Sequence, residues 1–313
     1  TAGNTGNITV ADPIAYTGAS ARTLTLTAEG GISFDGNPSP GNITSAAAAL
    51  TLTLNAATTI TNLRNVDLFG GVLTLNATGN AMQAGVISGT TSVVKNGAGT
   101  FTLSSNNTYT GTTTINAGTV TLENSNKLAD GSSIVVNGGT FDINTKNETV
   151  TGVQLLSGSI TGTTGTLTST TAYDMQVGSV SAKLDGAVGL TKTNAGTVTL
   201  SGANTYTGAT TISAGILALG ATNAVGPSSA VTVASGATFN LNGFSDMIGS
   251  LAGAGTVTSG AAGAVTLTAG GNTTTTTFSG ILQDGSGTLA LTKAGAGTLT
   301  FSGANTYSGA TTA

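Results

Sequence analysis

Side chains capable of acid–base chemistry are scarce in this chain. Charged residues make up 6 % of its 313 residues, and there is no histidine and no cysteine. Histidine is the side chain that most readily exchanges a proton near neutral pH, so that route to catalysis is closed. After Lys192 the only charged residues are Asp246, Asp284 and Lys293. The composition therefore argues against a dense catalytic cluster in the C-terminal part of the chain.

Two pairs of aspartates are the candidates for glycoside hydrolysis, which needs two apposed carboxyl groups. They are Asp174 with Asp185, and Asp130 with Asp142. Nothing in their spacing places either pair on one face of a fold. We therefore predict no catalytic residue in this chain.

Two glycine-rich segments are the candidate sites for a metal ion or a phosphate. Gly138–Asp142 (GGTFD) is one partial match to the calcium-binding nonapeptide, but no tandem copies follow it. Leu251–Gly255 (LAGAG) is followed by neither a lysine nor a helix-forming stretch, both of which a phosphate loop needs. We therefore predict no metal site and no cofactor, and we interpret the second segment as a turn.

The lysines Lys95, Lys192 and Lys293 recur at intervals of 97 and 101 residues. One interpretation is a ladder of cations that binds sugars or anions, although several turns of the chain would separate its members. We prefer a second interpretation, in which each lysine is a charge at a strand edge that limits wrong pairing. Lys127 and Glu148 are 21 residues apart, and we predict a weak surface ion pair between them.

Three tyrosines and three asparagines repeat together with the lysines. They are Tyr109, Tyr206 and Tyr307, each preceded two residues earlier by Asn107, Asn204 and Asn305. The rings could serve as platforms for sugars, but we favour a packing role, in which each ring fills a corner and its hydroxyl bonds to the backbone. The asparagine amides are expected to cap turns.

These residues belong to one phrase that occurs three times, starting at Gly97, Asn194 and Gly295. The second copy reads NAGTVTLSGANTYTGATTISAG, and the other two differ from it at few positions. A long period built from short alternations of apolar residues and threonine is typical of a repetitive β structure. The third copy stops at Ala313, which predicts that the chain is a piece of a longer protein.

A shorter period lies within the phrase. Short runs that alternate apolar and polar residues start 19 and 21 residues apart, as at Thr100–Leu103, Thr119–Leu122 and Thr140–Ile143. Such alternation is the pattern of a strand with one buried face. Phe101, Val120 and Phe141 hold equivalent places, so we expect them to stack in the interior.

Two architectures could produce this pattern. A meander of hairpins would place strands every 8–12 residues and would need turn signals between most runs. A parallel β-helix would stack turns of about 20 residues, with glycine-rich corners such as Ala117-Gly118 and Ala214-Gly215. We predict an all-β parallel β-helix. It would be one continuous domain over residues 1–313, with long repeats near 80–180, 178–280 and 277–313.

Composition also limits the partners and the compartment. The net charge is −4 and there is no basic cluster, which argues against binding nucleic acid. No apolar run approaches the roughly 20 residues of a membrane helix, and the first residues lack the pattern of a signal peptide. Absence of cysteine can arise by chance, in a reducing cytosol, or from export in an unfolded state.

The residues of the phrase themselves suggest a family. Leu291–Thr312, with Thr275–Leu282 ahead of it, is similar to the passenger-associated repeat of bacterial autotransporters. Pro13–Gly36 resembles the adhesins of the two-partner, filamentous-haemagglutinin type. The resemblance implies a right-handed parallel β-helix and type V secretion through an outer-membrane transporter. It also implies an extracellular location or the outer cell surface of a Gram-negative bacterium.

Two functions of different classes remain open at this point. We expect a structural or adhesive surface element, not an enzyme, that mediates attachment, aggregation or fibre formation. Its partners would be like molecules, associating end to end or laterally, and glycans or proteins of a host or cell surface. The alternative is a β-helix enzyme that degrades polysaccharides.

Overall fold

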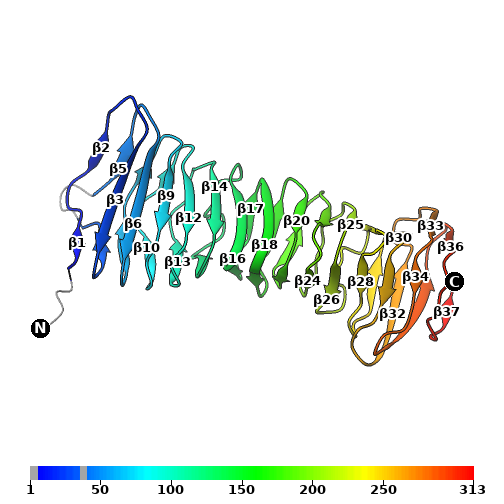
Figure 1. Cartoon of the computed structure of the whole chain (residues 1–313). Coiled ribbons are helices and arrows are strands. Elements are labelled where there is room, and N and C mark those ends of the chain that lie inside the picture. Colours follow the sequence, from blue (N-terminus) through cyan, green and yellow to red (C-terminus); the bar gives the residue numbers. More distant parts are fainter. Residues whose placement is uncertain (1–5, 36–40) are drawn as a thin grey trace, which may run out of the picture. The chain divides into compact units, whose positions relative to one another are not determined.

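The computed structural model of the chain describes residues 6–35 and 41–313, and all of its regular elements are β-strands (Figure 1). The contacts divide the chain into two compact units, residues 1–152 and 153–313, which are described separately. The boundary falls inside the first long repeat expected from the sequence. Gly36, the last residue of the segment similar to two-partner adhesins, lies outside the described residues.

The first unit contains strands β1 to β17, most of them two to four residues long. They are β1 (Ile8–Thr9), β2 (Ile14–Tyr16), β3 (Arg22–Ala28), β4 (Ile32–Ser33), β5 (Ile43–Ser45), β6 (Leu50–Ala56), β7 (Ile60–Leu63), β8 (Val66–Asp67), β9 (Val72–Leu75), β10 (Ala81–Gln83), β11 (Ile87–Ser88), β12 (Ser92–Lys95), β13 (Thr100–Leu103), β14 (Thr112–Ile115), β15 (Thr119–Leu122), β16 (Ser133–Asn144) and β17 (Glu148–Val150).

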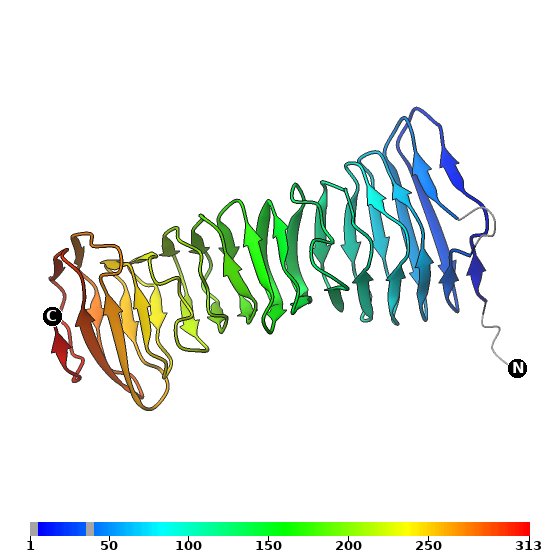
Figure 2. The ribbon, with the colours of Figure 1, turned by 180° about the vertical axis from the view of Figure 1, so that it is seen from behind.

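Successive turns of the first unit add strands to three parallel stacks (Figure 1; Figure 2). One stack runs β3–β6–β9–β12–β14–β16. A second runs β1–β4–β7–β10–β13–β15 and ends on the later half of β16. The third is β2–β5–β8–β11. Every described pairing is parallel, so the β-solenoid prediction is confirmed and the meander of hairpins is wrong.

The core of the first unit consists of columns of equivalent residues. Phe101 pairs with Val120, and Val120 pairs with Phe141, as the sequence predicted. All three side chains are fully buried. Each buried apolar side chain contributes roughly 1.5–3 kcal/mol relative to an exposed one, so the stability of the unit grows turn by turn.

The second unit contains strands β18 to β37, the first of which begins at Gly152. They are β18 (Gly152–Gly162), β19 (Thr166–Ser169), β20 (Tyr173–Met175), β21 (Gly178–Val180), β22 (Lys183–Asp185), β23 (Leu190–Lys192), β24 (Thr197–Leu200), β25 (Thr210–Ile212), β26 (Ile216–Leu219), β27 (Ala230–Val233), β28 (Thr238–Asn240), β29 (Asp246–Ile248), β30 (Ser250–Gly253), β31 (Thr256–Thr258), β32 (Ala264–Ala269), β33 (Thr276–Phe278), β34 (Ile281–Leu282), β35 (Thr288–Lys293), β36 (Leu299–Phe301) and β37 (Thr311–Thr312).

The second unit repeats the same architecture. Its parallel stacks include β18–β20–β23–β25–β27–β30–β33–β36 and β18–β21–β24–β26–β28–β31–β34. A further stack is β29–β32–β35–β37, and β19 pairs with β22. Val198, Leu217 and Phe239 form a buried column equivalent to that of Phe101. No helix among the described residues is long and apolar enough to cross a membrane.

Two glycines are required at equivalent corners of the two units. Gly118 and Gly215 both have φ of +68°, the left-handed region that L side chains rarely adopt. A Cβ atom on Gly118 would lie 2.4 Å from the carbonyl oxygens of Gly97 and Gly99 on the preceding turn. A Cβ atom on Gly215 would meet two carbonyl oxygens at the same 2.4 Å. A side chain at either position would therefore have both an unfavourable backbone conformation and a steric clash with the preceding turn.

We expect Gly118→Ala and Gly215→Ala each to lower the free energy of unfolding by about 2 kcal/mol or more, because both the backbone conformation and the space are unfavourable for a methyl group. The measurement is urea unfolding followed by circular dichroism. Gly131→Ala is the matched control, since the nearest atom to its added Cβ would be at 3.4 Å, an ordinary contact. Equal losses for all three variants would contradict this account.

Candidate functional site

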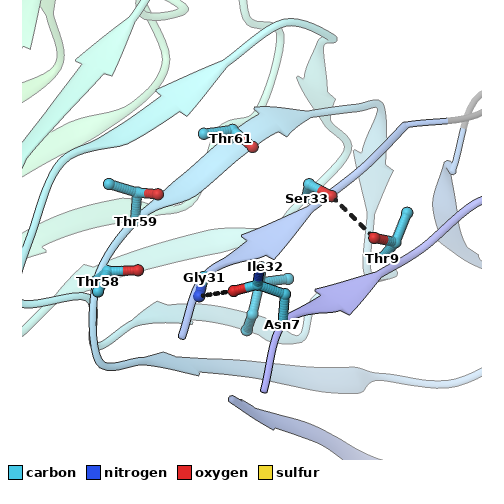
Figure 3. Close-up of a pocket in the computed structure, with 8 residues that line it drawn as sticks. All are labelled: Asn7, Thr9, Gly31, Ile32, Ser33, Thr58, Thr59 and Thr61. Carbon is cyan, nitrogen blue, oxygen red and sulfur yellow. Dashed lines mark hydrogen bonds between the residues drawn. The ribbon is translucent and has the colours of Figure 1, made fainter. Parts of the chain in front are cut away.

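A polar pocket of about 330 Å³ lies over the first turns of the first unit (Figure 3). It is lined by residues of β1, β4 and β7 and of the segments just before these strands: Asn7, Thr9, Gly31, Ile32, Ser33, Thr58, Thr59 and Thr61. Thr9, Ser33 and Thr61 fall in one register column, so three hydroxyls are stacked at one wall. Asn7 Oδ1 accepts the Gly31 N–H at 2.8 Å, and Ser33 Oγ lies 3.3 Å from Thr9 Oγ1.

The pocket can hold a polar ligand but offers no catalytic group. None of its lining side chains is ionisable, so no general acid or base activates the hydroxyls. Hydroxyl and amide groups donate and accept hydrogen bonds without selecting for charge. A neutral polar molecule is therefore the ligand class that fits these walls.

The structure places Asp174 and Asp185 on different stacks of strands. Asp174 lies in β20, where it accepts hydrogen bonds from Gln154 Nε2 at 2.6 Å and Thr193 Oγ1 at 3.0 Å. Asp185 lies in β22, which belongs to a different stack. Among the described residues, no three Asp or Glu side chains are close enough to hold a metal ion.

Asn107 and Asn204 are buried corner residues that join successive turns. Asn107 Oδ1 accepts the Ile87 N–H of the preceding turn at 2.8 Å, and its Nδ2 donates to the Lys127 carbonyl of the next turn at 2.8 Å. Asn204 does the same between Leu184 (2.7 Å) and Ala224 (2.6 Å). Both amides thus bridge turns, which the spacing of the asparagines does not predict, and Asn107 also donates within its own turn to the Ser105 carbonyl at 3.1 Å.

The third asparagine, Asn305, is half-buried. Its Oδ1 accepts the Leu282 N–H at 2.8 Å, while its Nδ2 donates within its own turn to the Gly303 carbonyl at 3.2 Å.

A buried carboxylate follows Asn107 and Asn204 two turns later, and it contacts the turn in between. Glu148 Oε2 accepts the backbone N–H groups of Lys127 at 2.8 Å and Leu128 at 3.3 Å. Asp246 Oδ2 accepts those of Ala224 at 3.0 Å and Val225 at 3.1 Å. The two acids are 1 % and 4 % exposed, and Glu148 Oε1 and Asp246 Oδ1 have no partner among the described residues.

These two acids are therefore hard to ionise. Burial raises the pKa of Glu148 to about 7, with a further increase from the nearby Asp130 carboxylate. Burial raises the pKa of Asp246 to about 6. Their equivalence could have been found in the sequence, because Glu148 follows Asn107 by 41 residues and Asp246 follows Asn204 by 42.

The predicted surface ion pair between Lys127 and Glu148 is wrong. Glu148 is buried and contacts the backbone of Lys127, whereas Lys127 Nζ donates to Asn106 Oδ1 of the preceding turn at 2.8 Å. At an interior corner the backbone N–H groups need acceptors, and the Glu148 carboxylate satisfies two of them.

Lys95 and Lys192 are also inside the fold and are not strand-edge charges. Both side chains are fully buried, in columns otherwise formed by residues such as Leu75 and Ile115 for Lys95. Lys95 Nζ donates to the Gly97 carbonyl, and Lys192 Nζ donates to the carbonyls of Asn194 and Ala214. Burial lowers the pKa of Lys95 to about 8 and lowers that of Lys192.

Lys293 repeats this contact in a half-exposed position, where its ammonium group donates to the carbonyls of Ala294 and Gly295. The three lysines thus satisfy corner carbonyls, and the buried two cannot meet a ligand at the surface.

Tyr109 and Tyr206 fill corners, and both are fully buried. Their hydroxyls bond to side chains four residues later, Thr113 at 2.5 Å and Thr210 at 2.8 Å. The expected bond to the backbone is present for Tyr206, whose hydroxyl also accepts the Gly226 N–H. Tyr307 makes the equivalent bond to Thr311 at 2.6 Å but is half-buried. Burial raises the pKa of Tyr109 and Tyr206, which keeps them neutral.

The corner residues recur in segments that match a known family model. The model is that of the passenger-associated-transport-repeat, and it matches residues 93–122, 190–219 and 291–313. The chain carries three passenger-associated transport repeats. The first repeat spans β12 to β15 and contains the buried lysine, the bridging asparagine, the corner tyrosine and the required glycine.

The transport repeats and the β-solenoid together fit an autotransporter passenger domain. The repeat family implies secretion to the cell surface or the extracellular space. No curated protein and no solved structure matches the chain.

The buried acids predict an unusual dependence of stability on pH. Their pKa values are raised on folding, so their contribution is complete below the unfolded values of 4.5 and 3.8 and is lost as pH rises to about 7. We expect the free energy of unfolding to fall between about pH 4.5 and 7. Above pH 8 the lowered pKa of Lys95 should reverse the slope.

Urea unfolding across this pH range tests the expectation. The double variant Glu148→Gln/Asp246→Asn should flatten the decline between pH 4.5 and 7. Asp284→Asn is the control, because Asp284 is half-exposed and its pKa is lowered by its hydrogen bonds to Ser308 and Leu289. An unchanged slope in the double variant would refute the assignment.

The bridging amides predict a second stability effect. Asn204→Ala should cost about 2–4 kcal/mol, because it leaves the buried Leu184 N–H and Ala224 carbonyl without partners. Asn305→Ala should cost less, since Asn305 is half-buried and joins only one turn to another. Chemical unfolding of both variants provides the comparison, and the reverse order would be inconsistent with a bridging role.

Proposed function

We propose that this chain is a structural and adhesive segment of an exported passenger, displayed on the outer surface of a Gram-negative bacterium, and that it is not an enzyme. The observation that carries the proposal is the use of the interior ionisable groups. Glu148, Asp246, Lys95 and Lys192 are all buried; the acids accept backbone N–H groups of the neighbouring turn, and the lysines donate to backbone carbonyls of their own corner. Such groups stabilise a scaffold and are not available to a substrate.

The surface supports attachment through neutral contacts. Most outward positions of the strands are threonine, serine or asparagine, which form hydrogen bonds without long-range charge steering. The hydroxyl-lined pocket over β1, β4 and β7 is of a size used for small ligands. We assign it to a neutral glycan of a host or neighbouring cell.

An attachment assay tests this function. Beads coated with the purified chain should bind to neutral glycans on an array, and Thr61→Arg should abolish that binding by filling the pocket and adding a charge. Thr119→Arg is the matched control, since Thr119 is a half-exposed strand residue outside the pocket.

A separate digestion assay tests the enzyme alternative. The chain is incubated with a panel of polysaccharides, with and without calcium, and the products are sized. Depolymerisation that disappears in Asp174→Asn or Asp185→Asn would overturn the proposal. In the attachment assay, equal binding of wild type and Thr61→Arg to the neutral glycans would also overturn it.

A further inference from the structure

One face of the first unit is a regular grid without charge. It is formed by the outward residues of β3, β6, β9, β12, β14 and β16, which lie side by side (Figure 1). We call it the grid face. Its three register columns are Thr23–Thr51–Val72–Ser92–Thr112–Ser133, Thr25–Thr53–Thr74–Val94–Thr114–Val135 and Thr27–Asn55–Asn76–Asn96–Asn116–Asn137. All of these residues are exposed or half-exposed.

The asparagine column holds the grid face in register. Each amide donates to the oxygen of the residue one turn earlier, from Asn55 to Thr27 at 3.0 Å through to Asn137 to Asn116 at 3.0 Å. The intermediate bonds are 2.6, 3.0 and 2.7 Å long. The ladder fixes the asparagine side chains, and the β-branched threonines are intrinsically stiff at χ1. Little side-chain entropy therefore remains to be lost when a partner binds.

The hydroxyls of the other two columns are unused. Those of Thr25, Thr53, Thr74 and Thr114 make no hydrogen bond with any described residue, and the same holds for the five hydroxyls of the first column. They alternate with the methyl groups of threonine and valine. The grid face thus offers free donors and acceptors beside apolar surface, as interfaces between proteins do.

The outward residues of the grid face carry no charge, although Arg22, the first residue of β3, is exposed at its edge. The stack β21–β24–β26–β28–β31–β34 of the second unit is uncharged as well, whereas other stacks carry charges. Lys95 of β12 points inward, and Asp142 of β16 lies in the half that pairs with β15. The stack of β2, β5, β8 and β11 carries Asp67, and in the second unit Asp174 lies on the stack of β18, β20 and β23. Charges on exposed strands normally oppose association between sheets. The grid face has no such safeguard.

We propose that the grid face binds the grid face of a second copy of this chain, so that two molecules associate laterally as a two-fold dimer. The proposal rests on the adhesive function proposed above and names one partner for it. A second copy is the partner whose rows repeat every ~4.8 Å, the spacing between strands on this face. The rows of hydroxyls and methyls of the two copies can then interdigitate along the whole face.

The area of the grid face agrees with this partner. Six strands ~4.8 Å apart and three columns ~7 Å apart cover roughly 600 Å². Two such faces would bury about 1,200 Å², the lower limit of specific protein interfaces. Because both molecules use the same patch, the contact is isologous and closes at two copies.

Sedimentation of the purified chain between about 1 and 100 μM tests the proposal, since this range spans micromolar affinities. Wild type should form dimers. Thr74→Lys and Thr74→Asp, at the centre of the grid face, should each raise the dimer dissociation constant at least tenfold, because like charges face each other. Mixing the two variants should restore association. Thr121→Lys on β15, outside the grid face, should dimerise like wild type.

Other outcomes overturn the proposal. The proposal is wrong if wild type remains monomeric at the highest concentration. It is also wrong if Thr74→Lys still dimerises, or if Thr74→Lys and Thr74→Asp fail to associate when mixed. If wild type is monomeric and binds polysaccharide, and Thr74→Lys abolishes that binding, the grid face binds a glycan and not a second copy. If the wild-type chain is monomeric but still binds glycans through the pocket, only this inference is contradicted. If the wild-type chain forms dimers but binds no glycan, only the proposed adhesion is contradicted.

Discussion

Parallel hydrogen bonding between successive turns is the constraint on which the rest of this structure depends. It places residues about one turn apart in the chain, such as Phe101 and Val120, directly above one another. A residue type repeated at that spacing becomes a continuous column, apolar inside and polar outside. Every other feature of the molecule, from the corner amides to the grid face, is a consequence of this alignment.

The same alignment explains why polar groups can be buried at the corners. Where the chain turns, backbone N–H and carbonyl groups leave the strand ladders and need other partners. Asn107, Asn204, Glu148 and Asp246 provide them from the neighbouring turn, and the lysines satisfy the carbonyls within the corner. The chain has few charged residues, and several of them have this structural task. Hydroxyl and amide groups occupy most of the outward strand positions.

A surface with so few charges has a cost and a use. Exposed parallel strands without charge are poorly protected against association with other strands. A protein displayed outside the cell can use that property for contact with neighbours, provided that its own fold is held by many small interactions. The transport repeats fit this picture, because their shared residues are corner and column residues and none of them forms a reactive cluster.

The expectations drawn from the sequence succeeded for the apolar columns and for the glycines and tyrosines of the corners, and failed for the buried charged residues. Alternation and period predicted the parallel stacking of Phe101, Val120 and Phe141, the glycines with positive φ and the buried corner tyrosines. They did not predict that Lys95 and Lys192 lie inside. Spacing alone cannot show whether a lysine at a strand end points outward or bends its ammonium group back to a corner carbonyl.

The sequence by itself determined that this chain is an all-β solenoid built on the passenger repeat, because periodicity along the chain translates directly into stacking between turns. Only the tertiary structure decided which polar residues are buried. Glu148 and Lys127 looked like a surface pair, but Glu148 accepts backbone N–H groups of the adjacent turn and the Lys127 ammonium group donates to the side chain of Asn106. The physical reason is that burial at a corner depends on where the neighbouring turn bends, which no local pattern of residue types specifies.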